Sequence, residues 1–280
     1  MSIQGPLRSV SRHRLGVCSV ELPSGTVEAS DLKRPLVVLP TYNEAANVGE
    51  MLGRLSEVLP HGSVLVVDDG SPDGTADVVE AAALSLPIDV TVLRRAKKLG
   101  LGTAYREGFR WGLARGHEAL VQMDSDFQHD PAAVPSLLTA LDAGADMAIG
   151  SRYVPGGSIP DSWPRSRRQL SRWGNRYASG VLRLGVHDAT AGFRAHRASF
   201  LSALGLDSID TDGYGFQVQL TYRARRAGGV IVEVPISFGE RTRGDSKMSG
   251  RIIVEAFGMA TRTAARDRLA RRLRPRPRGR

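Results

Sequence analysis

The sequence predicts an α/β fold built on a doubly wound, mostly parallel sheet. From Leu36 onward, short aliphatic runs alternate with longer segments of helical periodicity, which is the pattern of βαβ units. Five such runs fall within residues 36–149, with a helix expected between successive runs. Polar residues directly follow three of the runs, at the carboxyl ends where open parallel sheets bind ligands.

The first half of the chain is built from these strands and helices. The first strand, at 36–39, is aliphatic and is stopped by Pro40, which has no N–H for strand pairing. Asn43 can cap the next helix, in which apolar residues recur at helical spacing from Val48 to Leu55. The alternation continues with a strand at 64–67, a turn-rich segment at 68–74, a helix at 75–84, a strand at 90–93, a helix at 103–114, a strand at 119–123, a helix from about residue 131 and a strand at 147–149.

The second half of the chain is less regular. Residues 151–187 are rich in glycine, proline and arginine, and we expect them to form a covering segment that is part loop and part helix. Strand-like residues surround Phe193, a helix is expected at 214–226, and an aliphatic run at 230–236 completes the globular part.

Three regions follow from this pattern. We expect a disordered leader at 1–34, a single globular domain at 35–246, and a C-terminal amphipathic helix with a basic tail at 247–280. The Arg-Pro repeats near the C-terminus cannot continue that helix. Its apolar face would consist of Ile253, Phe257 and Ala260.

The net charge of +9 is concentrated at the ends of the chain. Residues 262–280 carry +8 and residues 1–34 carry +2, whereas residues 35–261 carry −1. A basic balance favours a nucleic acid or an anionic membrane as partner. The tail contains no Phe, Tyr or Trp to stack on bases, so a nucleic acid is the less favoured partner and a membrane surface the more favoured one.

Cysteine content and hydropathy favour a cytoplasmic location. Cys18 is the only cysteine, so the chain can form neither an intrachain disulfide nor a cysteine-based zinc site. The longest uncharged stretch, at 131–141, is much shorter than the roughly 18–20 residues of a membrane-spanning helix. We expect no signal peptide, because Glu21 and Pro23 interrupt the only mildly apolar N-terminal stretch.

Three polar clusters, at 40–44, 68–71 and 124–128, carry the candidate chemistry. A single Asp after a strand is more often a turn former or a helix cap. Two clusters hold paired carboxylates without an adjacent Lys or Arg, which capping explains less well. In the third cluster, Asp124, Asp126 and Gln128 offer oxygen ligands for Mg²⁺ or Mn²⁺, which phosphate oxygens would complete.

The neighbouring residues narrow the class of ligand. His129 is expected at the surface or as a cap rather than as a metal ligand. The chain has no Walker-type G-x-x-x-x-G-K-[ST] loop and no G-x-G-x-x-G after the first strand. A P-loop ATPase and a dinucleotide dehydrogenase are therefore disfavoured.

Taken in order, the motifs resemble those of a known family. The chain holds VVLPTYNE at 37–44, VDDGSPDGT at 67–75, KLGLGTAY at 98–105, DSDFQH at 124–129, GSRY at 150–153 and VPISF at 234–238, followed by Arg241, Gly244, Ser246 and Lys247. This set resembles the family-2 inverting glycosyltransferases of the GT-A fold, and more narrowly the dolichol-phosphate (polyprenol monophosphate) mannose synthases. The resemblance spans about residues 36–250.

The resemblance implies a metal-dependent enzyme that moves mannose from GDP-mannose to a polyprenyl phosphate, peripherally bound at the cytoplasmic face of a membrane. A metal, Mg²⁺ or Mn²⁺, would neutralise the leaving diphosphate as a Lewis acid. Asp126 would be the catalytic member of the metal and diphosphate motif Asp124, Ser125, Asp126 and Gln128. Arg241 and Lys247 match positions that hold the donor diphosphate, although an isolated Lys is more often a solvated charge.

The resemblance also implies a nucleotide pocket. Tyr42 would stack on the base, and Asp69 would accept N–H hydrogen bonds from it. From the residues alone, Tyr42 could equally be an amphipathic side chain at the rim. The pocket as a whole would consist of Pro40, Tyr42, Glu44, Val67 and Asp69.

The acceptor decides which catalytic groups are needed. A lipid phosphate is already ionised near neutral pH, so it attacks without a general base. It needs cations for positioning, and bidentate arginine suits this task best. Arg152 and Arg167 match the family's acceptor-side positions, but three neighbouring arginines leave the second assignment open. Those neighbours are Arg165, Arg168 and Arg172.

Three competing functions remain open at this point. The same fold could use UDP-glucose and make polyprenyl phosphoglucose, because Asp69 can pair with an imide N–H of either base. A sugar-phosphate nucleotidyltransferase shares the sheet and acidic site but places a glycine-rich basic loop after the first strand, which 40–44 does not supply. A nucleic-acid-binding protein is the third. Whether a separate membrane protein anchors the chain is also left open.

Overall fold

The computed structural model describes residues 18–19, 32, 34–209, 211, 213–240, 258 and 261–263. Strands and helices alternate along most of this length, as the sequence predicts. The elements are β1 Cys18–Ser19, β2 Leu36–Thr41, α1 Ala45–Val58, β3 Ser63–Asp68, α2 Thr75–Ala83, β4 Asp89–Arg94, α3 Leu101–Ala114, β5 Ala119–Gln122, α4 Val134–Asp142, β6 Met147–Ser151, α5 Arg165–Leu182, β7 Arg194–Arg197, α6 Ala198–Ser202, α7 Gly213–Arg226 and β8 Ile231–Pro235, with 3-10 turns at Pro131–Ala133 and Leu206–Ser208.

Across the described residues, the strands form one eight-stranded sheet in the order β1-β8-β6-β7-β5-β2-β3-β4. β5, β2, β3 and β4 are parallel neighbours, and so are β1, β8 and β6. β7 lies between these halves and runs antiparallel to both β5 and β6. The predicted mixed, mostly parallel sheet is confirmed.

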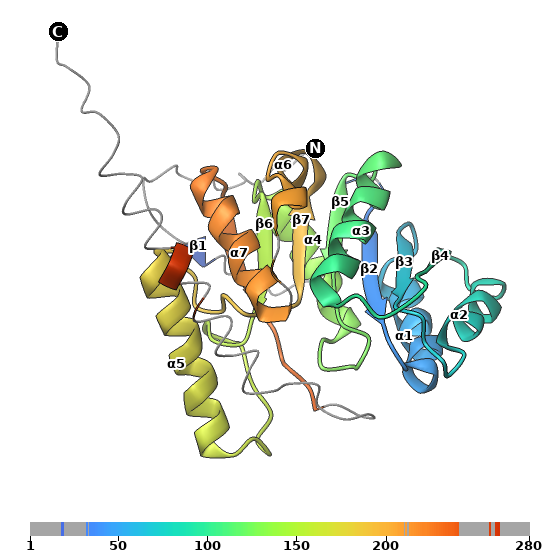
Figure 1. Ribbon diagram of the computed structural model, residues 1–280, viewed down its shortest axis with the longest axis horizontal. Helices are drawn as coiled ribbons and strands as arrows, with labels where there is room; N and C mark the ends of the chain where they lie inside the picture. The colour runs from blue at the N-terminus through green and yellow to red at the C-terminus, as the bar shows by residue number, and fades with distance from the viewer. Residues whose placement is uncertain are drawn as a thin grey trace, which may run out of the picture.

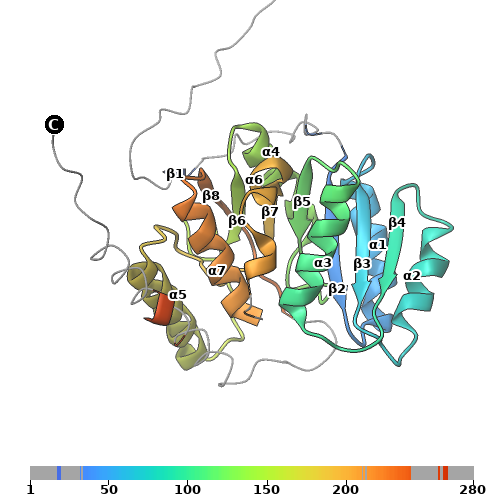
Figure 2. The ribbon, with the colours of Figure 1, turned by 45° about the horizontal axis from the view of Figure 1, so that its top comes forward.

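Helices cover both faces of the sheet (Figures 1 and 2). α3, α6 and α7 pack on one face, and α1, α2 and α4 on the other. Along β2, Leu36 and Val38 enter the first core whereas Val37 and Leu39 enter the second, as the two-residue period of a strand requires. Both faces are therefore apolar, which explains the unbroken aliphatic run. α5 stands beside the sheet edge formed by β8 and β1.

The start of α1 differs from the prediction. Asn43 adopts a left-handed φ of 58° outside the helix, and α1 has no side-chain cap of its own. The loop after β3 supplies the acceptors instead: Asp73 Oδ2 accepts from the N–H of Ala45, and Thr75 Oγ1 from the N–H of Glu44, each at 3.0 Å. The prediction that Asn43 caps this helix is wrong, because a neighbouring loop satisfies the N–H groups.

The two ends of the chain are described only in part. Cys18 and Ser19 form a two-residue strand beside β8, a pairing that the expected disordered leader did not include. Gly258 and residues 261–263 are helical, and the hydroxyl groups of Tyr177 and Thr261 lie 2.8 Å apart. The predicted apolar face at Ile253 to Ala260 lies outside the described residues. No helix among those described is both long and apolar enough to cross a membrane.

Candidate active site

The polar clusters predicted from the sequence meet at one edge of the sheet. Thr41 ends β2 and Asp68 ends β3, in register with each other. Asp68 is buried and accepts hydrogen bonds from Thr41 Oγ1 (2.9 Å) and from the N–H (2.9 Å) and hydroxyl (2.6 Å) of Ser71. This carboxylate therefore shapes the turn, which is the ordinary role of an Asp after a strand.

Asp69 fastens a second loop to this edge. It is 5% exposed, and Arg95 Nη1 donates to its Oδ1 at 2.5 Å. The N–H groups of Leu99 and Gly100 donate to its Oδ2 at 3.2 and 3.1 Å. Both carboxylate oxygens thus already have partners, and the loop 95–100 is held over the end of β3. That Asp69 also accepts from a nucleotide base stays a prediction.

The other predicted pocket residues have different surroundings. Tyr42 is half-buried, with Lys98 Nζ 4.0 Å from its ring centroid, so the ring lies beside the same loop. Pro40 is half-buried, and Glu44 Oε2 accepts from Asn47 Nδ2 at 2.8 Å. The side chain of Val67 is fully buried in the core below, so it offers no exposed surface to a ligand.

The loop after β5 carries the two carboxylates of the predicted metal motif. Asp124 has a side chain 36% exposed, and its Oδ1 accepts from the hydroxyl of Tyr105 at 3.0 Å. Asp126 is 5% exposed, and its Oδ1 accepts from the N–H of Gln128 at 3.1 Å. Gly192 approaches from the strand side: a Cβ there would lie 3.3 Å from Asp124 Oδ2.

Two buried side chains fix the position of Asp124. Burial first, and then the charge of Asp124, raises the pKa of Tyr105, so its hydroxyl keeps its proton and donates to the carboxylate. The backbone N–H of Asp124 donates to His129 Nδ1 at 3.3 Å. Burial lowers the pKa of His129, so its ring is neutral and can accept this hydrogen bond.

His129 corrects a prediction. It is 3% exposed, stacks 5.2 Å from the ring of Phe193, and meets Phe238 edge-on at 5.4 Å. The prediction of a surface or capping histidine is therefore wrong, because the aromatic partners lie directly before β7 and after β8, which the local sequence does not reveal.

The acidic pair fits a hard divalent cation whose other ligands come from a substrate. Asp124 and Asp126 supply carboxylate oxygens of the kind that Mg²⁺ and Mn²⁺ prefer. Within the described residues, no group of three or more His, Cys, Asp and Glu side chains could hold a metal ion. A cation here would therefore depend on phosphate and water oxygens to complete its shell.

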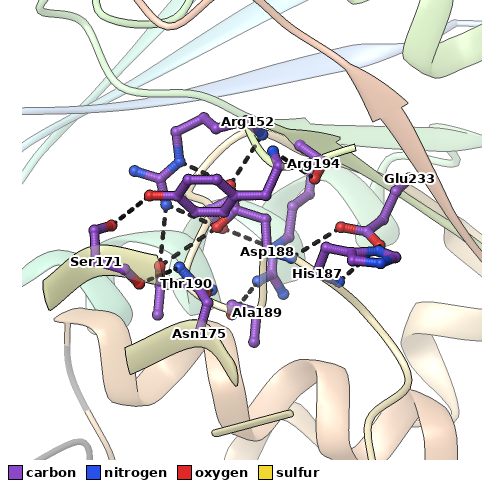
Figure 3. A network of polar contacts seen from close by, with 12 residues as sticks. Arg152, Ser171, Asn175, His187, Asp188, Ala189, Thr190, Arg194 and Glu233 are labelled. Atoms are coloured by element: carbon purple, nitrogen blue, oxygen red, sulfur yellow. Dashed lines mark hydrogen bonds and ion pairs between the residues drawn. The ribbon is translucent and has the colours of Figure 1, made fainter. Parts of the chain in front are cut away.

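Arg152 lies at the end of β6 in a buried ion-pair network (Figure 3). Its Nε and Nη2 donate to Oδ2 and Oδ1 of Asp188, each at 2.7 Å, and Nη2 also donates to Thr190 Oγ1 at 3.1 Å. Burial alone would raise the pKa of Asp188, but Arg152 lowers it below its ordinary value, so the pair is ionised. Glu233 Oε1 accepts from the N–H of Asp188 at 2.9 Å and fixes it from β8.

A second buried arginine, Arg194, holds the same loop through hydrogen bonds to its backbone (Figure 3). Arg194 is fully buried and donates to the carbonyl oxygens of Ala189 and Ala191 at 2.7 and 2.8 Å. Burial lowers its pKa to about 10, which leaves it charged at neutral pH. Asn175 Oδ1 accepts from the N–H of Thr190 at 3.0 Å, which joins the loop to α5.

Arg167 lies in the first turn of α5, half-buried, with its guanidinium carbon 3.9 Å from the ring centroid of Trp163. Trp163 meets Phe238 edge-on at 5.9 Å, and the guanidinium carbon of Arg152 lies 5.1 Å from the same Phe238 ring. Because His129 also contacts Phe238, one aromatic side chain links the acidic loop, Arg152 and the Trp163–Arg167 pair. Arg241 and Lys247 lie outside the described residues.

Several functional residues escaped the sequence analysis. Asp188 and Glu233 are separated from Arg152 by 36 and 81 positions, and only the antiparallel β7 brings the loop before it beneath β6. The sequence did not single out Arg95, which forms the ion pair with Asp69. One signal in the sequence could have indicated these residues: they are charged side chains in segments whose other residues are apolar and expected to be buried.

Comparison with known proteins adds independent findings. Residues 36–205 match the family model described as glycosyl transferase family 2. The chain is 49% identical to the polyprenol monophosphomannose synthase of Mycolicibacterium smegmatis, over 85% of this chain and 90% of that protein. It is 51% identical to the undecaprenyl-phosphate mannosyltransferase of Micrococcus luteus, over 82% of this chain and 93% of that protein.

A solved structure shows the same fold. Glucosyl-3-phosphoglycerate synthase from Mycobacterium tuberculosis, in complex with Mn²⁺, UDP-glucose and phosphoglyceric acid, superposes with a TM-score of 0.64. The superposition covers 83% of this chain and 80% of that one, at 20% identity. At this identity the likeness concerns the GT-A fold alone.

Proposed function

Because the chain belongs to glycosyltransferase family 2, we propose that it transfers mannose from GDP-mannose to a polyprenyl phosphate. The names of the two relatives at about half identity, each covered over nine-tenths of its length, support the acceptor class and the sugar. The observation that carries the proposal is the arrangement around Phe238, where an acidic loop suited to a metal diphosphate adjoins two arginines suited to a phosphate.

The reaction needs no general base from the protein. A phosphate oxygen of the ionised lipid attacks the anomeric carbon, the bond from that carbon to the diphosphate breaks, and GDP leaves with the electron pair. Attack from the side opposite to GDP inverts the anomeric configuration. Asp124 and Asp126, with Gln128 beside them, would hold a divalent cation, which would neutralise the charge of the leaving diphosphate.

The chain's own residues orient the two substrates. The hydroxyl of Tyr105 holds the carboxylate of Asp124, and Asp188 holds the guanidinium of Arg152 in one plane. Arg152 and Arg167 would face the acceptor phosphate and supply positive charge for its positioning, Arg152 through its Nη1 group, since its Nε and Nη2 donate to Asp188 and Thr190. We assign the donor diphosphate also to Arg241 and Lys247, and the base to the pocket of Tyr42 and Asp69.

The acceptor lipid places the reaction at a membrane surface, and we propose the cytoplasmic face. The choice of GDP-mannose over UDP-glucose belongs to the proposal too. A thermal-shift comparison of GDP and UDP in the presence of Mn²⁺ tests this choice of donor. Stronger stabilisation by UDP than by GDP would indicate that the donor is a UDP-sugar. A separate anchoring protein would be identified by co-purification from membranes.

Direct assay tests the transfer itself. The purified protein, with GDP-mannose, a divalent cation and a polyprenyl phosphate, should form polyprenyl phosphomannose, identified by its mass. The Asp126→Asn variant should lose on the order of 100-fold or more in kcat, as expected when charge stabilisation of a leaving group is removed. Asp142→Asn, an exposed carboxylate on α4, is the matched control. Full metal-dependent transfer by Asp126→Asn would overturn the mechanism.

A further inference from the structure

A basic cavity adjoins Arg152, between α5 and the loop that follows β6. It has a volume of about 860 Å³, which is the size of many ligand pockets. One wall is the loop from Arg152 to Gly157, and another is formed by residues 185–187. The third wall is α5, which contributes Arg172, Arg176 and Arg183 (Arg183 directly after its last turn).

Arg172 and Arg176 are four residues apart and therefore lie on one face of the helix. Arg183 ends the helix with a left-handed φ of 53° and lines the same cavity. Arg167 precedes Arg176 by nine residues, which is about 180° around a helix, so it points to the opposite side. The cavity is thus distinct from the surface where Arg167 would meet the acceptor phosphate, although Arg152 borders both.

The charge of this face is not balanced by the rest of the fold. Among the described residues, no hydrogen bond or ion pair engages the side chains of Arg172, Arg176 and Arg183, all of which are exposed. The nearby carboxylates already have partners: Asp188 pairs with Arg152, and Glu233 accepts from the ring of His187 at 2.9 Å. The cavity therefore presents several cations to an anion that the chain does not provide.

The neighbouring face of α5 is apolar and exposed. Leu170 is 48% exposed and Trp173 is 57% exposed, and Tyr177 stacks on Trp173 at 5.5 Å. The spacing of three and four residues aligns them beside the arginine face. A helix with adjacent apolar and arginine-rich faces is typical of one that lies in the headgroup region of a membrane.

We propose that the cavity of Arg172, Arg176 and Arg183 binds the phosphodiester headgroup of an anionic bilayer phospholipid, while Leu170 and Trp173 enter the lipid surface beside it. The headgroup is not a substrate: it holds α5, and with it the acceptor side of the site, against the membrane. The inference accords with the proposed transfer but needs neither donor nor acceptor lipid, so binding and transfer can fail separately.

Vesicle binding tests the inference with the full chain. Sedimentation with phosphatidylcholine vesicles, with and without phosphatidylglycerol, is compared for the wild type and for the triple variant Arg172→Gln, Arg176→Gln and Arg183→Gln. Each arginine at an anionic surface contributes about fivefold, so the triple variant should bind phosphatidylglycerol vesicles on the order of 100-fold more weakly.

The matched control removes the same charge elsewhere. Arg94, Arg110 and Arg115 are exposed residues of β4 and the α3 end, remote from α5 (Figure 2), and their joint replacement by Gln should change binding less than about threefold. Thermal unfolding checks that both variants fold. A Trp173→Ala variant should also weaken binding, and should do so at high salt as well, because its contribution is apolar.

Three outcomes would overturn the inference. An equal loss of vesicle binding in the two triple variants would mean that any surface arginine contributes as much as those of the cavity. Equal binding of the wild type to vesicles with and without phosphatidylglycerol would exclude an anionic headgroup. Displacement from vesicles by low millimolar inorganic phosphate or glycerol phosphate would indicate a site for a free anion rather than for a lipid.

Discussion

At the scale of single residues, Arg167 offers the sharpest test of the acceptor assignment. The sequence left Arg165, Arg167, Arg168 and Arg172 as candidates. In the structure the guanidinium of Arg167 packs on the ring of Trp163, whereas that of Arg168 donates to the carbonyl oxygen of Trp163. We expect Arg167→Ala to raise KM for the polyprenyl phosphate by about 10–100-fold, the value of a hydrogen bond to a charged group, with KM for the donor unchanged. Arg165→Ala, an exposed change in the same turn, is the control. Equal effects of the two substitutions would contradict the assignment.

Asp188 and Arg152 illustrate how a buried ion pair links stability to pH. The pKa of Asp188 lies below its ordinary value of 3.8 in the folded protein, so the folded state binds its proton less tightly than the unfolded state does. Its stabilising contribution is therefore complete above pH 3.8 and is lost as the pH falls further, through the folded pKa.

Asp188→Asn should remove that dependence. It leaves the buried guanidinium of Arg152 without a counter-charge, and we expect a loss of about 3–5 kcal/mol in the free energy of unfolding at pH 7. Urea titrations at pH 7 and at successive values below pH 4 should show the wild type losing stability faster than the variant. Parallel curves would mean that the pair contributes nothing to acid sensitivity. Asp142→Asn serves as the exposed control.

At the scale of secondary-structure elements, the glycines of α3 allow the helix to lie close against the sheet. A Cβ on Gly108 would stand 2.4 Å from Val38 Cγ1, so the helix could not keep its present position. Gly108→Ala should therefore cost about 1–3 kcal/mol of stability despite the better helix propensity of alanine. In α1, a Cβ on Gly53 meets nothing within 4 Å, so Gly53→Ala should stabilise by roughly 0.5–1 kcal/mol. Chemical denaturation measures the free energy of unfolding of both variants. A gain in stability in both would contradict the close approach of α3 to the sheet at Gly108.

The elements also show what sequence patterns can and cannot predict. The strands were predictable because burial on both faces demands continuous aliphatic runs. That Asp124 and Asp126 share one loop followed from their separation of two positions, whereas their binding of a metal stays a prediction. The start of α1 was not predictable, because the N–H groups there donate hydrogen bonds to Asp73 and Thr75, which belong to another loop. Arg152 was predicted as an acceptor cation, but its partner Asp188 could not be found without the antiparallel strand between β5 and β6.

At the scale of the whole molecule, positive charge is concentrated in a second region besides the tail. The central region is nearly neutral in total, yet the described fold gathers Arg172, Arg176 and Arg183 on one side of α5. A neutral sum therefore hides a local basic face. Arg95 and Arg152 pair with the carboxylates of Asp69 and Asp188, whereas no described carboxylate pairs with the three arginines of α5. Membrane attraction can accordingly come from two regions, and their contributions can be separated by experiment.

Truncation after Thr263 measures the contribution of the tail. It removes eight arginines and one aspartate but keeps the helical residues whose Thr261 hydroxyl meets Tyr177. We expect at least about a tenfold loss of binding to phosphatidylglycerol vesicles at low salt and a smaller loss at high salt, because the Debye length shortens from about 30 Å to 3 Å between 0.01 and 1 M. GDP binding, measured by thermal shift, should not change. A full-length chain with those eight arginines replaced by Gln separates charge from length.

Combining the truncation with the triple α5 variant tests whether the two regions act independently. If the tail binds lipid without displacing α5, the two losses multiply, as for distant sites that share no partner. If the triple variant has no further effect once the tail is removed, α5 reaches the membrane only after the tail has bound. Unchanged vesicle binding on truncation, with the triple variant still impaired, would reduce the tail to solvated sequence and leave α5 as the membrane-binding element of the catalytic domain.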